Sequence, residues 1–152
     1  CNADLLAEDR IAGSSIAEVL ATKAAALSHT PTVFIASLRN VTATAAAVYD
    51  EQLARGGRTA INLVLVGDGG RFAVEDYLAA GAIANGLSER GLDHSSPDVA
   101  VAIEGFRPLP RAVKHLFSAS AAGLAAAEAG RRDEVKASAL LDADELAFRF
   151  GD

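Results

Sequence analysis

The sequence lacks clustered positive charge and long hydrophobic runs, and both absences exclude a class of partner. Its 152 residues carry a formal net charge of −6, and no basic stripe is available to neutralise phosphates. No apolar run reaches the roughly 18 residues of a membrane-spanning helix, and the first residues do not resemble a signal peptide. We therefore expect neither a nucleic-acid partner nor a membrane, and we predict that the protein is cytoplasmic.

Cysteine is nearly absent, because the single cysteine, Cys1, is also the first residue. One cysteine cannot form an internal disulfide. Its position leaves two interpretations open: the sequence is a fragment, or a longer precursor is cut to expose Cys1. In the second case the terminal amine serves as the base for the thiol, as in enzymes with an N-terminal nucleophile. An acyl or amide carbon is then the target, with Asn2, Asn40 or loop amides stabilising the oxyanion.

Two kinds of ligand-binding pattern are also missing. The glycine-rich stretch GDGG has neither the Walker spacing nor the G-x-G-x-x-G spacing of nucleotide-binding loops. The three histidines lie far apart and show no metal-ligand spacing. The sequence therefore supports neither a nucleotide nor a histidine-bound metal.

What the chain does have is enough apolar sequence, 51% of its residues, to form one domain with a buried core. Helices are expected over about 42–55, 74–91 and 110–128, and another helix at Ser96-Pro97. Short strands are expected at 32–37, 61–66 and within 134–141, followed by a closing turn or short helix over 142–150. The run at 61–66, INLVLV, is typical of a parallel strand covered on both faces. This alternation predicts a single α/β domain over 1–152, with a largely parallel sheet flanked by helices.

Polar and flexible residues follow two of the predicted strands. Ligands of open α/β sheets bind beyond the carboxyl ends of the strands, so we expect the two following loops to share one site. A hydroxyl, a guanidinium and an amide come from the first loop, and a carboxylate and closely approaching backbone amides from the second. The candidate residues are Ser37, Arg39 and Asn40 in the first loop, and Asp68, Gly69 and Gly70 in the second.

Two adjacent acids, Glu75 and Asp76, begin the helix that follows the glycine loop. Acids in the first turn stabilise the helix macrodipole by about 0.3–1 kcal/mol, which alone explains many such pairs. The functional alternative is a Mg²⁺ site, because Mg²⁺ binds through one or two carboxylates together with substrate oxygens and water. The residues alone leave both interpretations open.

Three segments, in their order along the chain, resemble the 2-phosphosulpholactate phosphatase family. TVFIASLRNVTATA is similar to a strand followed by small-x-L-x-N-A in that family. GDGGRFAVEDYLAAGAIANGL is similar to its G-x-x-G-x-[FL]-x-x-E-D-x-x-x-A-G segment. FSASAAGLAAAEAGRRDEVKASALLDADE is similar to its closing S-x-x-G and G-x-x-D-[DE]-V region. Shared order and spacing make this resemblance more specific than any single motif.

The resemblance implies an α/β phosphatase fold and Mg²⁺-dependent hydrolysis of a phosphate ester on a small, strongly anionic hydroxy acid. It implies that Asn40, Asp68, Glu75 and Asp76 take part in the site, the last two as metal ligands. In the implied mechanism the metal polarises the phosphoryl group, and Arg39 and backbone amides hold its oxygens. A carboxylate orients the attacking water.

The chain also departs from the family pattern. The family's earlier segments, D-V-x-R-A-[ST], N-S-P and T-N-G-[ST], are absent, although CNAD at the start resembles a diverged remnant of the last one that retains Asn2. Leu124 stands where the family commonly has an arginine. We therefore expect the C-terminal portion of the family fold, completed by an N-terminal partner chain or segment in an oligomer. Two alternatives to the phosphatase stay open: a self-processed enzyme that uses Cys1, and a non-catalytic assembly subunit.

Overall fold

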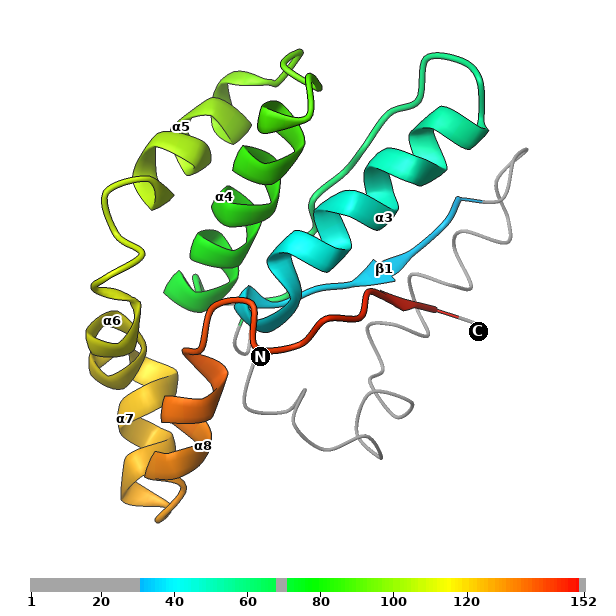
Figure 1. The fold of residues 1–152 in the computed structure, drawn as a ribbon. Helices are drawn as coiled ribbons and strands as arrows, with labels where there is room; N and C mark the ends of the chain where they lie inside the picture. Colours follow the sequence, from blue (N-terminus) through cyan, green and yellow to red (C-terminus); the bar gives the residue numbers. More distant parts are fainter. Residues whose placement is uncertain (1–30, 68–70, 151–152) are drawn as a thin grey trace.

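The computed structural model describes residues 31–67 and 71–150, and most of this part is helical. Figure 1 shows α5, α4 and α3 as neighbouring helices, with the β1–β2 pair beside α3 and with α6, α7 and α8 grouped near the start of α4. The elements in chain order are β1 (Phe34–Ile35), the 3-10 helix η2 (Leu38–Asn40), α3 (Val41–Ala54), α4 (Val74–Glu89), α5 (Pro97–Phe106), α6 (Val113–Ala119), α7 (Ala121–Glu128), α8 (Arg132–Ser138) and β2 (Phe148–Arg149).

The predicted α/β architecture with a largely parallel sheet is wrong. The sheet in the described residues has two short antiparallel strands, in which Phe34 pairs with Arg149 and Ile35 with Phe148. The apolar run 61–66 adopts no regular secondary structure, and no described residue forms a backbone hydrogen bond with it. A strand exists only when a neighbouring strand takes up its N–H and C=O groups, and hydrophobic pattern does not reveal that neighbour.

Two expectations near the C-terminus are also wrong. The strand predicted within 134–141 is largely helix α8, which has acids in its first turn and Lys136 in its last turn, as the helix macrodipole favours. The turn or short helix expected over 142–150 instead contributes β2. Both segments are short, so contacts made elsewhere in the fold decide their conformation.

The helices α3, α4 and α5 confirm the sequence prediction, whereas the long helix expected over 110–128 is divided. Ser96 caps α5 and Pro97 is its first residue, as predicted. At Ser120 the backbone is extended, with φ −69° and ψ 161°, which ends α6 and begins α7. Within the described ranges, no helix has the length and apolar character needed to cross a membrane.

Helix α4 lies at the centre of the hydrophobic core. It contacts η2, α3, α5 and α6, and Leu78 on it is 2% exposed. The crossing with α5 is close at Gly81, where a Cβ atom would lie 2.3 Å from the carbonyl oxygen of Ala102. Glycine permits this approach of two helix backbones. The packing therefore fixes the position of α4, and with it the first turn that carries the two acids.

Candidate active site

Glu75 and Asp76 are buried in the first turn of α4, and each carboxylate binds a different neighbour. The two residues are 6% and 9% exposed. Asp76 Oδ2 accepts a hydrogen bond of 2.7 Å from the backbone N–H of Gly67, at the start of the glycine loop. Glu75 Oε1 accepts a hydrogen bond from the hydroxyl of Ser120, between α6 and α7. The acidic pair thus joins α4 to the glycine loop on one side and to the α6–α7 corner on the other.

The two ends of the glycine loop lie against each other directly before α4. Gly67 has φ +72°, and a Cβ atom there would lie 2.7 Å from the carbonyl oxygen of Arg71. Both the left-handed backbone and the close approach require glycine. Five predicted site residues lie outside the described residues: Cys1, Asn2, Asp68, Gly69 and Gly70.

The SLRN segment forms η2 and leads into α3, and its polar groups hold the turn together. The Ser37 hydroxyl accepts a hydrogen bond of 3.2 Å from the backbone N–H of Arg39, and Asn40 Oδ1 accepts one of 2.9 Å from the N–H of Ser37. The buried Asn40 amide also donates to the carbonyl oxygens of Ile35 and Leu146, both at 3.4 Å. In this structure Ser37 and Asn40 therefore shape the segment.

Arg39, predicted to hold phosphate oxygens, is bound to an acid of the C-terminal segment. Its Nε and Nη2 donate to the two carboxylate oxygens of Asp144 at 2.8 and 2.7 Å, and its Nη1 donates to the carbonyl of Ala137 at 2.7 Å. The hydrogen bonds to Asp144 raise the pKa of Arg39 above its ordinary value. Because a guanidinium has five N–H donors, two remain for a further acceptor, but its charge is already balanced.

Sequence reasoning missed Asp142 and Asp144, which fasten the C-terminal segment to the SLRN region. Asp142 accepts hydrogen bonds from the N–H and the hydroxyl of Thr42, at 2.7 and 2.8 Å, and so caps the start of α3. The backbone N–H groups of Asp142 and Asp144 donate to the carbonyls of Leu38 and Arg39. These partners lie about 100 residues apart in sequence, so no local pattern reveals them.

The structure brings the predicted site elements together in part. Helix η2 packs against α4, and Leu38 and Leu78 share the same hydrophobic core. The bond between Gly67 and Asp76 joins the glycine loop to α4. No hydrogen bond or ion pair in the described residues links the SLRN side chains directly to either acid of α4.

Comparison with known families decides which family this arrangement belongs to. A family model described as 2-phosphosulpholactate phosphatase matches residues 16–150, which is most of the chain. The chain belongs to this family. The match to the 2-phosphosulpholactate phosphatase family includes the SLRN segment, the glycine loop, the start of α4 and the α6–α7 corner. Searches of curated proteins and of solved structures gave no match.

Membership of the 2-phosphosulpholactate phosphatase family raises the question of a metal, and the donor chemistry of the acidic pair fits Mg²⁺. Each carboxylate has one oxygen in a hydrogen bond to the protein, and no described residue bonds to the second. Residues 31–67 and 71–150 contain no group of three or more His, Cys, Asp or Glu side chains placed to hold a metal ion. A cation at Glu75 and Asp76 therefore needs additional ligands from water, substrate or another part of the protein.

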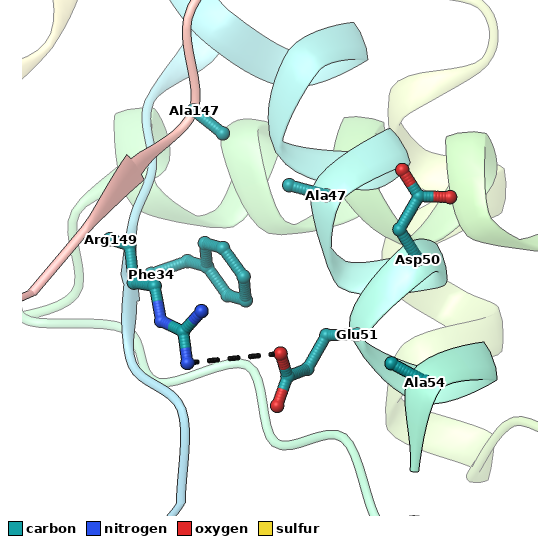
Figure 2. Close-up of a pocket in the computed structure, with 7 residues that line it drawn as sticks. All are labelled: Phe34, Ala47, Asp50, Glu51, Ala54, Ala147 and Arg149. Carbon is teal, nitrogen blue, oxygen red and sulfur yellow. Dashed lines mark ion pairs between the residues drawn. The ribbon is translucent and has the colours of Figure 1, made fainter. Parts of the chain in front are cut away.

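A separate hollow of about 410 Å³ lies between α3 and the β1–β2 pair. Figure 2 shows the Glu51 and Arg149 side chains pointing toward each other across it, 3.9 Å apart. Glu51 also accepts a hydrogen bond of 2.6 Å from the Thr32 hydroxyl, and this bond together with those from Arg55 lowers the pKa of Glu51. Of the predicted site residues that the structure describes, none lines this hollow, so it is distinct from the site around Glu75 and Asp76.

Proposed function

We propose that this member of the family hydrolyses the phosphate ester of a small, strongly anionic hydroxy acid resembling 2-phosphosulpholactate, with Mg²⁺ bound at Glu75 and Asp76. The observation that carries the proposal is the buried acidic pair beside the glycine loop, within the segment that the family model matches. Buried carboxylates are unfavourable unless their charge is compensated. One hydrogen bond to each supplies part of this compensation, and a cation supplies the rest.

We assign a role to each residue of the proposed site. Asp76 holds the N–H of Gly67, the first residue of the glycine loop. We assign the substrate's phosphoryl oxygens to the loop amides and to the remaining N–H donors of Arg39, and the orientation of the attacking water to Asp68. When bound, Mg²⁺ supplies Lewis-acid polarisation of the phosphoryl group.

We also propose that an N-terminal partner chain or segment completes the fold. The support is the exposure of most of the run 61–66, in which Val64 is 59% and Leu65 is 41% exposed, although Leu63 packs partly buried against the core. Contiguous exposed apolar side chains are typical of a surface that another segment or chain covers. A partner would bury the side chains of this run.

Release of phosphate from 2-phosphosulpholactate, measured with and without Mg²⁺, tests the proposed activity. Glu75→Gln and Asp76→Asn are suitable variants because an amide oxygen still accepts the hydrogen bonds from Ser120 and Gly67, while the charge is lost. We expect each variant to lower kcat on the order of 100-fold or more. The exposed Asp50 on α3 provides the matched control, and Asp50→Asn should retain wild-type activity. Activity independent of Mg²⁺, or full activity in both site variants, would contradict the proposal.

The N-terminal nucleophile stays a prediction, because Cys1 lies outside the described residues. Intact mass spectrometry of the product of the complete reading frame tests it. Two co-purifying chains for the wild type and one uncut chain for Cys1→Ala would support self-processing. An uncut product in both cases would rule out the self-processed enzyme.

A further inference from the structure

The corner between α6 and α7 presents the hydroxyl of Ser120 to the buried Glu75. Ser120 Oγ donates to Glu75 Oε1 and also lies 2.9 Å from the carbonyl oxygen of Phe117. As the N-cap of α7, the same oxygen accepts a hydrogen bond of 2.9 Å from the N–H of Gly123. The hydroxyl is thus held by groups from both helices of the corner, and its position relative to α4 is set by them.

Gly123 makes this compact corner possible. A Cβ atom there would lie 1.8 Å from the carbonyl oxygen of Phe117 and 3.1 Å from Ser120 Oγ. Because the first of these contacts is with backbone, a side chain would force α7 away from α6. Phe117 is itself buried in the core, which anchors the corner. The spacing Ser-x-x-Gly therefore has a physical basis: the serine caps the helix, and the glycine permits the approach.

The hydroxyl has one proton, and Glu75 and the Phe117 carbonyl are its two possible acceptors. An ionised carboxylate only accepts hydrogen bonds, and bonds to a charged acceptor are stronger than bonds to a neutral carbonyl. The proton therefore goes to Glu75 when this residue is ionised. This bond uses one of the two lone-pair sites of Oε1, and no described residue bonds to Oε2, so Oε2 is the more available oxygen for a cation.

We propose that Ser120 is a positioning residue that orients the Glu75 carboxylate toward the metal and substrate, which makes the α6–α7 corner part of the site. The inference rests on the proposed function, because it requires Glu75 to act there. Removing the hydrogen-bond partner of a metal ligand typically lowers metal affinity or activity by about 10- to 100-fold.

The test compares Ser120→Gly, Ser120→Thr and Ser96→Gly. Glycine is nearly as good an N-cap as serine, so Ser120→Gly removes the bond to Glu75 and largely retains α7. Ser120→Thr restores the hydroxyl. Ser96→Gly is the matched control, because Ser96 caps α5 through Val99 and has no bond to an acid among the described residues. The readouts are Mg²⁺ affinity by calorimetry, kcat and KM for phosphate release, and the melting temperature.

We expect Ser120→Gly to weaken Mg²⁺ binding about 10-fold and to lower kcat by a similar factor, with KM changed less. Ser120→Thr should recover most of both losses, and Ser96→Gly should change neither. The melting temperature should fall more for Ser120→Gly than for Ser96→Gly, because the buried Glu75 carboxylate loses its hydrogen bond. Should Ser120→Gly fail to fold, Ser120→Asp serves instead, because an ionised aspartate caps a helix but has no proton to donate.

Two results would overturn the inference. If Ser120→Gly binds Mg²⁺ and turns over substrate like the wild type while Glu75→Gln does not, the proposed function stands and the positioning role is wrong. If the wild type neither binds Mg²⁺ nor releases phosphate, the proposed function is wrong, and the contact between Ser120 and Glu75 serves only to stabilise the fold.

Discussion

Helix α4 and the run 61–66 are both rich in apolar residues, yet their environments are opposite. Helix α4 buries Leu78 and even two carboxylates, whereas the run leaves Val64 59% exposed. A helix forms its backbone hydrogen bonds within itself, so packing alone is enough to bury it. An extended segment also needs a neighbouring strand. Leu63 of the run still packs, partly buried, against the core. The comparison teaches that an apolar pattern predicts full burial more reliably where the segment forms its own backbone hydrogen bonds.

The largest expected effect is at Leu78 in the middle of the α4 core. Leu78→Ala should lower the free energy of unfolding by about 2–5 kcal/mol, because it removes buried methyl groups and leaves a cavity. Val64→Ala in the exposed run is the matched control and should change stability by less than about 0.5 kcal/mol. Urea denaturation of the two variants measures both values. Equal losses of stability in Leu78→Ala and Val64→Ala would contradict the claim that α4 is buried and the run 61–66 is exposed.

A smaller loss is expected where α4 crosses α5. Gly81→Ala should destabilise the protein by about 1–3 kcal/mol, because the new methyl group meets the backbone carbonyl of Ala102. The control is Gly57→Ala, just before the exposed run, where the nearest atom to a new Cβ is 3.9 Å away. Thermal unfolding of the two alanine variants compares them. A Gly81→Ala protein as stable as Gly57→Ala would mean that the two helices are not in close contact.

Glu51 lies on α3 beside the sheet. Its hydrogen bonds should make a modest contribution to stability, and the size of this contribution should depend on pH. Their stabilisation is fully present above the ordinary glutamate pKa, and it is lost as pH falls through the lowered pKa of the folded protein. Glu51→Gln should therefore be less stable than the wild type at neutral pH, and the difference should shrink in acid. Melting temperatures of both proteins between pH 7 and strongly acidic pH measure this change. A difference that is constant with pH would contradict the assignment.

The smallest effect on this chain alone is expected at Val64. Val64→Lys should change the free energy of unfolding by less than about 0.5 kcal/mol, because the side chain is already in contact with water. In a protein that includes the proposed N-terminal partner, the same substitution should weaken assembly, as measured by light scattering or co-purification. If assembly is unaffected, the partner does not cover the run 61–66.

The sequence predicts the helices well and the sheet poorly. Helices α3 and α4 and the start of α5 follow from local signals, such as Ser96-Pro97 at the start of α5, and the structure confirms them. The sheet was predicted wrongly because strand pairing depends on distant segments, as the pairing of Ile35 with Phe148 illustrates. Local helix formation is encoded within a few residues, whereas a sheet is not.

The candidate site shows the same limit. The sequence identifies Glu75 and Asp76 as candidate site residues because they are adjacent at the start of a helix. The structure shows that both are buried. Their partners could not be predicted, because Ser120 lies 45 residues from Glu75 in sequence. The pair between Arg39 and Asp144 spans 105 residues, so the guanidinium assigned to an anionic substrate was found to bind an acid of the chain itself. Side-chain type suggested the chemistry, and the fold determined the partners.

Titration of Mg²⁺ into the wild-type protein, Glu75→Gln and Asp76→Asn by isothermal calorimetry tests the central claim most directly. We predict one binding site on the wild type and at least about 10-fold weaker binding to each variant, because each loses a charged ligand while keeping its hydrogen bond to the protein. Equal Mg²⁺ binding by all three proteins, or none by the wild type, would contradict the claim that the buried acids of α4 form a metal site.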